Sequence, residues 1–76
     1  MKELIRSIAM ELVDQPDQVV VTEIAGENNT LLELRVAKED IGKVIGKEGR
    51  TAQSMRTILA AMSTKIGRRA HLDIVD

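Results

Sequence analysis

Apolar residues near the start of the chain recur every three or four positions. They are Leu4, Ile5, Ile8, Ala9, Leu12 and Val13. Charged residues fall between them, so a helix formed here would be apolar on one side and polar on the other. The pattern therefore predicts an amphipathic helix over 2–13. Pro16 predicts where it ends, because a proline disfavours the helical conformation of the residue before it.

Two segments with strand character come next. Residues 19–25, VVVTEIA, are rich in β-branched side chains, which favour strands. Residues 30–37, TLLELRVA, alternate between apolar and charged positions. The apolar positions of this second segment are Leu32, Leu34 and Val36. Between the segments, GENN at 26–29 supplies the glycine and asparagine typical of a tight turn. The pattern predicts a β-hairpin.

From Lys38 onward the apolar period lengthens to that of a helix. Glu39 and Asp40 suit a first helical turn, where the helix dipole favours anions. The spacing predicts one helix over 38–45 and a longer one over 50–65. The apolar stripe of the longer helix is Ala52, Met55, Leu59, Met62 and Ile66.

The end of the chain predicts a helix cap followed by a strand. Gly67 falls where a left-handed C-terminal cap belongs, and residues 68–76 alternate as a strand does. The predicted order is helix, strand, strand, helix, helix, strand. We therefore expect one α+β domain spanning 1–76, a three-stranded sheet with helices packed on one face.

Composition excludes several classes of protein. The chain has no cysteine and one histidine, which argues against disulfides and thiolate or dedicated zinc sites. The opening run MKELIRSIAMEL carries charge throughout, so we expect neither a secretory signal nor a spanning helix, and a cytoplasmic location. Aromatic residues are absent, which weakens any interpretation based on stacking nucleic-acid bases on rings.

Charge is divided unevenly along the chain. Residues 1–34 carry a net charge of −5 and residues 35–76 a net charge of +4, within a total of −1. Seven basic residues against one acidic residue lie between positions 41 and 69. The basic ones are Lys43, Lys47, Arg50, Arg56, Lys65, Arg68 and Arg69. The second half could thus attract a polyanion, although an ordinary solvated surface would also explain the count.

The turn GKEG, Gly46 to Gly49, separates the two later predicted helices. Glycine at each end allows a sharp bend and close approach of a ligand to the backbone. The next helix starts at once, so its first amide groups should lack intrahelical partners and attract phosphate. Lys47 and Arg50 add charge at the turn, and Lys43 and Arg56 lie a turn or two away.

Two familiar nucleotide-binding motifs fit this turn poorly. The run GKVIGKE lacks the spacing and the hydroxyl residue of a nucleotide-hydrolase phosphate loop. A dinucleotide-binding motif would follow a strand, whereas this turn follows a predicted helix. A sharp turn with no ligand stays open as an alternative. The chain shows no catalytic constellation, so we expect no enzymatic activity and no cofactor.

The run VIGKEGR resembles the motif of KH domains, in which a GxxG loop between two helices grips single-stranded nucleic acid. The predicted order of elements matches the type II, prokaryotic KH arrangement. Nearly the whole chain resembles small bacterial proteins made of one such domain. The runs that carry this resemblance are LVDQPDQV, GKVIGKEGR and TKIGRRA.

The resemblance implies a set of RNA-binding residues around the turn. They are Lys43, Val44, Ile45, Gly46, Lys47, Glu48, Gly49, Arg50 and Arg56. Val44 and Ile45 would line an apolar groove for bases, with Ala52 and Met55 behind it. We also expect that Gly46→Asp weakens RNA binding and leaves the fold largely intact.

The resemblance further implies an RNA chaperone or post-transcriptional regulator linked to cell shape and envelope growth. Its partners would be single-stranded RNA and either a second copy or a larger multidomain RNA-binding protein with its own KH domain. No membrane or small-molecule partner is expected. The alternative is a module whose main task is pairing with protein, in which case Ile58, if exposed, and the edge strands matter more than the turn.

Overall fold

The computed structural model describes residues 1–75 and has the predicted order of elements. The helices and strands are α1 (Lys2–Leu12), β1 (Val20–Ala25), β2 (Asn29–Arg35), α2 (Ile41–Ile45), α3 (Arg50–Ile66) and β3 (Arg69–Val75). Short 3₁₀ turns occupy Pro16–Gln18, Lys38–Asp40 and Lys47–Gly49. The helix predicted over 38–45 is therefore a 3₁₀ turn followed by a five-residue α-helix.

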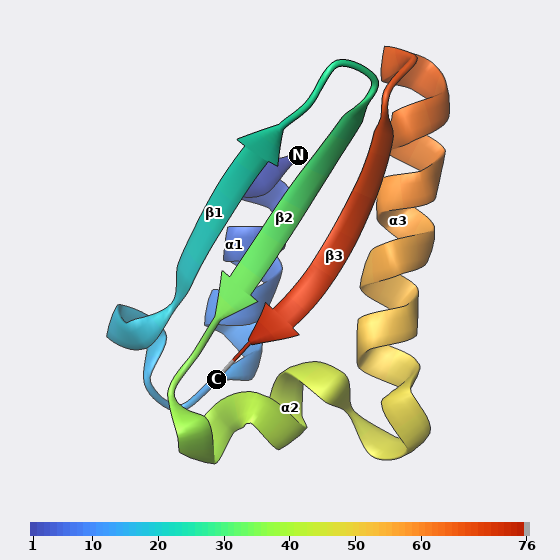
Figure 1. Cartoon of the computed structure of the whole chain (residues 1–76). Helices are drawn as coiled ribbons and strands as arrows, with labels where there is room; N and C mark the ends of the chain where they lie inside the picture. The colour runs from blue at the N-terminus through green and yellow to red at the C-terminus, as the bar shows by residue number, and fades with distance from the viewer. Residues whose placement is uncertain (76) are drawn as a thin grey trace.

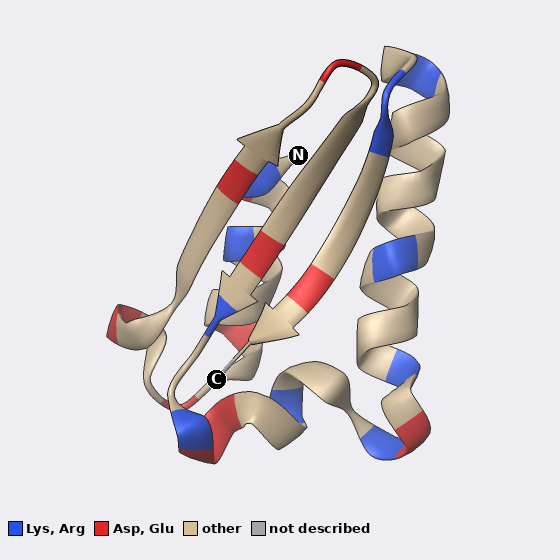
Figure 2. Cartoon of the chain, in the orientation of Figure 1, with Lys and Arg blue, Asp and Glu red and all other residues tan. Residues whose placement is uncertain are grey.

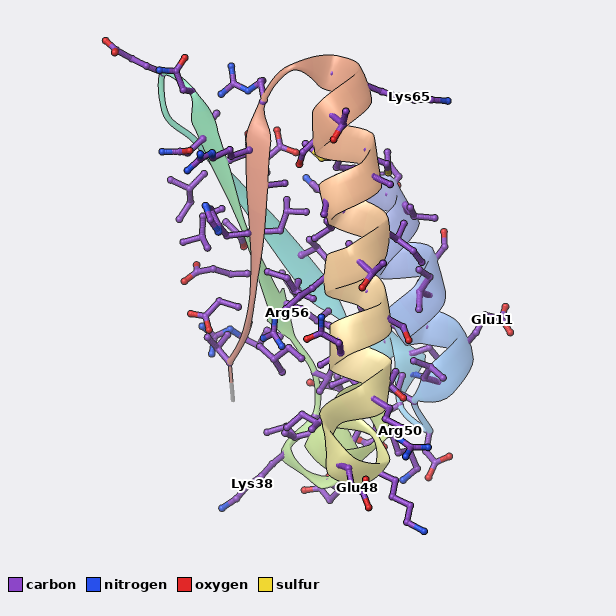
Figure 3. The ribbon with its side chains drawn as sticks, turned by 90° about the vertical axis from the view of Figure 1, so that its right-hand side faces the viewer. Glu11, Lys38, Glu48, Arg50, Arg56 and Lys65 are labelled. Carbon is purple, nitrogen blue, oxygen red and sulfur yellow. The ribbon has the colours of Figure 1, made fainter. Side chains whose placement is uncertain are left out.

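The three strands form one mixed sheet in the order β1-β2-β3. Strands β1 and β2 are the predicted antiparallel hairpin, with Val21 opposite Leu34. Strand β3 runs parallel to β2, with Leu72 beside Leu32. Figure 1 shows α1 behind the sheet, and the side view in Figure 3 places α1 and α3 on the same side of the strands. The fold is the two-layer α+β architecture that the sequence predicts.

The core lies between this sheet and the helices, and it contains only aliphatic side chains and methionine. Its members are Ile5, Ala9, Val13, Val19, Val21, Leu32, Leu34, Val36, Val44, Met55, Leu59 and Leu72. The alternation predicted for β2 is confirmed, because Leu32 and Leu34 are fully buried. The stripe predicted for α3 is wrong at its last position, since Ile66 stays 52% exposed.

The tip of the hairpin is tied to the connection between α3 and β3. Arg68 donates hydrogen bonds to the carbonyl oxygens of Gly26 (2.6 Å) and Asn29 (3.3 Å). The amide of Arg69 donates to the Asn28 carbonyl at 3.0 Å. Gly67 adopts φ 79° and ψ 20°, which confirms the predicted left-handed cap of α3. Arg68, one of the seven basic residues counted between positions 41 and 69, therefore stabilises the fold by holding the hairpin tip.

No helix within residues 1–75 is long and apolar enough to cross a membrane.

Candidate nucleic-acid interface

The turn between α2 and α3 has an unusual backbone. Gly46, Glu48 and Gly49 all have positive φ, at 77°, 57° and 73°. Gly46 combines its φ with a ψ of 172°, a region that essentially only glycine occupies. A Cβ at Gly46 would overlap the hydroxyl of Thr51 and lie 2.7 Å from its Cβ and 2.9 Å from its backbone nitrogen. Packing against α3 therefore requires glycine at position 46.

This geometry overturns one expectation. Gly46→Asp cannot leave the fold largely intact, because any side chain at position 46 would meet the backbone of Thr51. Gly49 differs, since a Cβ there would have no neighbour within 4 Å. Its left-handed φ is the only obstacle to a side chain at that position.

The turn uses some of its amides and leaves others exposed. The amide of Gly49 donates to the carbonyl of Gly46 at 3.1 Å, and the amide of Arg50 donates to the carbonyl of Lys47. Two of the donors expected to face a ligand are thus used within the turn. The amides of Lys47 and Glu48 donate to no carbonyl in the turn and loop contacts of residues 1–75, and both residues are exposed. These two amides remain available to a phosphate.

The charged side chains of the turn are open to solvent. Glu48 and Arg50 form an ion pair of 3.6 Å, but their side chains are 68% and 80% exposed. Such a pair stabilises a fold by about 0–1 kcal/mol and opens readily. Lys47 forms no ion pair within the described part of the chain. Lys47 is therefore the cation of the turn that is free to bind an anion.

Lys43, which the resemblance places among the RNA contacts, is already paired. Its ammonium lies 3.2 Å from the carboxylate of Asp14 and 3.5 Å from that of Asp40. The hydrogen bond and the charge of Asp14, with a smaller contribution from Asp40, raise the pKa of Lys43. Two carboxylates thus surround one ammonium. The side chains of Lys43 and Asp14 are 44% and 78% exposed, so this network reaches the surface, and only Asp40 within it is buried.

Arg56 lies beside β3 and not at the turn. Its guanidinium donates to the carbonyl of Leu72 at 3.4 Å. Arg50 and Arg56 are six positions apart on α3, which places them about 120° apart around the helix axis. Figure 3 accordingly shows Arg56 on the side of α3 that faces the sheet and Arg50 on the side of α1.

The apolar residues expected to line a groove are mostly buried. Val44 has no exposed surface, and Ala52 and Met55 are 3% and 1% exposed. Val44 therefore belongs to the core, and the expectation that it lines the groove directly does not hold in this structure. Ile45 is 38% exposed and remains available to a base. Ala52 and Met55 lie behind the surface, as expected.

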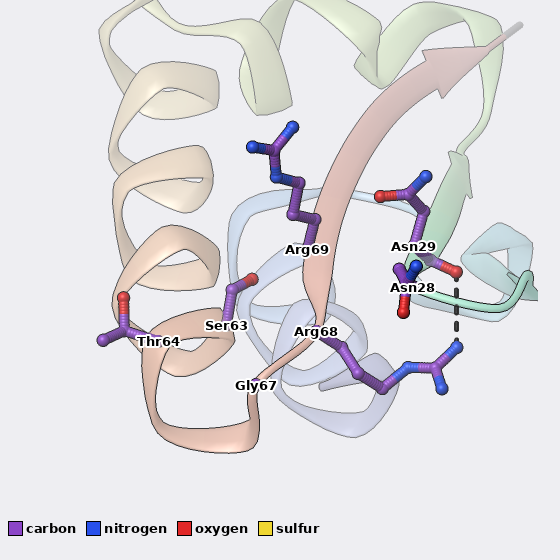
Figure 4. Close-up of a pocket in the computed structure, with 7 residues that line it drawn as sticks. All are labelled: Asn28, Asn29, Ser63, Thr64, Gly67, Arg68 and Arg69. Atoms are coloured by element: carbon purple, nitrogen blue, oxygen red, sulfur yellow. Dashed lines mark hydrogen bonds between the residues drawn. The ribbon is translucent and has the colours of Figure 1, made fainter.

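A hollow at the far end of α3 contains cationic and polar groups that the sequence did not single out. It has a volume of about 590 Å³ and is lined by Asn28, Asn29, Ser63, Thr64, Gly67, Arg68 and Arg69. Figure 4 shows Arg68 reaching the Asn29 carbonyl, while Arg69 extends between α3 and β3. The feature that could have located it is the basic pair directly after the helix-capping Gly67.

Charged residues of both signs are spread over the molecule. Figure 2 shows basic residues along the turn and α3, but also on α1, at the end of β2 and at the start of β3, and an acidic residue on each strand and at the turn. Arg56 and Arg69 lie beside β3, Lys47 lies in the turn, and Arg50 lies on the side of α3 next to α1.

Two features together define a KH domain of type II. One is the GxxG turn between α2 and α3, and the other is the three-stranded sheet in which β3 runs parallel to β2. The family model described as the KhpA/KhpB KH domain matches residues 2–74. The chain belongs to this family.

Curated relatives match over the whole length. RNA-binding protein KhpA of Clostridium acetobutylicum is 49% identical over 75 residues, covering 99% of this chain and 100% of the relative. The protein of the same name from Aquifex aeolicus is 50% identical, covering 100% and 96%. That of Treponema pallidum is 51% identical, covering 99% and 94%.

Solved structures support the fold. The crystal structure of an Aquifex aeolicus Era variant bound to GDP·AlF4⁻ matches 96% of this chain with a TM-score of 0.60 and 22% identity. Era in complex with MgGDPNP and nucleotides 1506–1542 of 16S ribosomal RNA matches 96% of this chain with a TM-score of 0.61 and 22% identity. The chain spans 28% of each Era chain, so the likeness concerns one part of that protein.

The two glycines of the turn should respond differently to alanine. Gly49→Ala should cost about 1 kcal/mol of the free energy of unfolding, because only its left-handed φ is strained. Gly46→Ala should cost about 3 kcal/mol or more, because backbone strain and overlap with Thr51 add together. Urea denaturation of both variants measures the difference. Equal losses would show that the contact with Thr51 does not constrain position 46.

Proposed function

We propose that the chain binds single-stranded RNA, with the Gly46–Gly49 turn gripping the backbone. The observation that carries this proposal is a turn in which Lys47 forms no ion pair among the described residues and the amides of Lys47 and Glu48 donate to no backbone carbonyl there. Positive φ at three of the four residues aligns the turn so that a phosphate can approach without meeting a side chain at either glycine. The names of the curated relatives support RNA as the ligand.

The RNA strand would continue from the turn along the surface between α3 and β3. Seventeen residues of α3 give a path of about 25 Å, long enough for about four nucleotides. Arg56 lies midway along this path and Arg69 at its far end.

Base contacts along this path would be small and aliphatic. Ile45 is exposed near the turn, and Ala60 and Ala70 line a hollow further along. Strand β3 lies at an edge of the sheet, where backbone groups can bond to bases. With no aromatic ring in the chain, we expect weak sequence preference, since phosphate contacts position a strand without reading it.

One domain of this kind binds weakly, so a second domain would raise affinity through effective concentration. We propose pairing with a second copy or with a KhpB-like protein, which would carry the same kind of KH domain according to the joint KhpA/KhpB family model. In that setting the chain would act in the cytoplasm as an RNA chaperone or post-transcriptional regulator linked to cell shape and envelope growth. It would act by binding and not as an enzyme.

A salt titration tests the RNA grip directly. Each phosphate contact in a single-stranded complex contributes about 0.7 to the slope of log K against log salt concentration. Lys47→Met should weaken binding to a single-stranded oligoribonucleotide and reduce the steepness of that slope by about 0.7. Fluorescence anisotropy over a series of salt concentrations measures both quantities.

Lys65→Met is the matched control for this test. Lys65 is an exposed lysine near the end of α3 that points away from the sheet (Figure 3). It should leave affinity and slope almost unchanged. If Lys47→Met behaved like Lys65→Met, the turn would not hold a phosphate.

The alternative function, a module that pairs with protein, is favoured by one observation. Ile58 is 39% exposed on α3, although a large aliphatic side chain is more stable when buried. If pairing uses this face, Ile58→Asp should convert a dimer to a monomer in analytical ultracentrifugation. Binding to RNA should weaken by lost avidity while the salt slope per domain stays the same. An unchanged mass would exclude this face as the site of pairing.

A further inference from the structure

Asp40 is the one buried charged residue among residues 1–75. It is 1% exposed and stands directly before α2, six positions ahead of the GxxG turn. A carboxylate is costly to bury unless it is paired and hydrogen-bonded. Its position therefore needs a reason beyond filling space.

Asp40 does not cap the helix that it precedes. An aspartate at this position commonly accepts hydrogen bonds from the first amides of its own helix. Here the carboxylate makes no such bond to α2. It instead accepts a hydrogen bond from the backbone amide of Gln15, at 3.0 Å from Oδ2. The two residues are 25 positions apart, so the bond joins the segment after α1 to the start of α2.

Two further contacts strengthen this junction. Lys43 bridges the same two segments, since its ammonium contacts both Asp14 and Asp40. The side-chain amide of Gln15 donates to Glu39 at 2.9 Å. We call the group of Asp14, Gln15, Asp40 and Lys43 the α2 latch.

The latch keeps Asp40 ionised. Burial alone would raise the pKa of Asp40, but hydrogen bonds from the backbone of Asp14 and Gln15, together with Lys43, outweigh it and lower the pKa. Its Oδ1 accepts no hydrogen bond from the described residues, and its neighbouring cation is Lys43. Lys43 thus serves as the counterion that allows a buried carboxylate to hold the amide of Gln15.

Helix α2 depends on such external contacts for its orientation. Five residues are too few for a stable isolated helix. Val44 holds α2 to the core, and the latch holds its beginning. The end of α2 continues directly into the turn, because Gly46 donates its amide to the carbonyl of Gly42 at 2.9 Å. A rotation of α2 would therefore move the amides of Lys47 and Glu48.

We propose that Asp40 is a positioning residue for RNA binding, which orients the GxxG turn through α2 and makes no contact with RNA, while Lys43 is its counterion and not a phosphate ligand. The effect of Asp40 on RNA affinity rests on the proposed RNA-binding function. The contacts of Asp40 with Gln15 and Lys43 are those of the protein without RNA. The segment that follows α1 thereby has a direct influence on the RNA-binding turn.

The first test uses the protein without RNA. Asp40→Asn keeps the shape of the side chain and an oxygen for the amide of Gln15, but it removes the charge that Lys43 balances. Proton–nitrogen correlation spectra should show shifted amide signals for Lys47, Glu48 and Gly49 in this variant. Asp17→Asn is the matched control, because it removes the charge of an exposed carboxylate in the same loop that forms no ion pair among the described residues, so it should leave those signals in place.

The second test uses a single-stranded oligoribonucleotide. Asp40→Asn and Lys43→Met should each weaken binding about fivefold. Such a loss is expected if only about one fifth of the variant molecules hold α2 and the turn in the orientation that binds RNA. The double variant should bind like either single variant, because both changes break the same latch. The salt slope should stay at the wild-type value, since no phosphate contact is removed.

Each contrary outcome has a definite meaning. A slope that falls by about 0.7 in Lys43→Met would show a direct phosphate contact and overturn the assignment. Turn signals that stay in place in a folded Asp40→Asn protein would overturn the positioning role. If Asp40→Asn failed to fold, the amide signals of Lys47, Glu48 and Gly49 in Lys43→Met would decide on the positioning role in the same way. If the wild type bound no RNA, the proposed function would fail, and the spectra of the free protein would still decide on the latch.

Discussion

The contact between Gly46 and Thr51 is the constraint on which the rest of the site depends. It lets the chain leave α2 and start α3 after four residues, three of which have positive φ. A side chain at position 46 would push α3 away from α2 and from the sheet, so the same glycine serves the core and the exposed turn. At this φ and ψ glycine is favoured over alanine, so Gly46 is explained by packing as well as by function.

Two of the basic residues form contacts within the protein, which narrows the set of cations that can bind RNA. Lys43 balances two carboxylates, and Arg68 holds the hairpin tip. Setting these two aside leaves Lys47, Arg50, Arg56, Lys65 and Arg69, of which Arg56 and Arg69 lie beside β3. A net charge of −1 is compatible with RNA binding because the acidic residues lie largely on α1, its following loop and the strands.

Local patterns allowed much of the fold to be predicted from the sequence. Periodicity located α1, the hairpin and α3, and Gly67 marked the end of α3, because these features depend on neighbours within a few residues. The GxxG turn was located for the same reason. The ion pairing of Lys43 could not be predicted, since its partner Asp14 lies 29 positions away and only the folded chain brings them together. The burial of Val44 and the overlap at Gly46 likewise depend on tertiary packing, and Arg69 became a candidate only when β3 was placed beside α3.

A polynucleotide strand that binds at the turn should continue along α3 and β3. Titrating the nitrogen-labelled protein with a short single-stranded oligouridylate, while following backbone amide signals, tests this path most directly. We expect the signals of Lys47, Glu48 and Gly49 to move first, together with those at the start of β3, while Thr22 and Glu33 within the sheet stay in place. Movement confined to the sheet or to α1, with the turn unaffected, would contradict the proposed path.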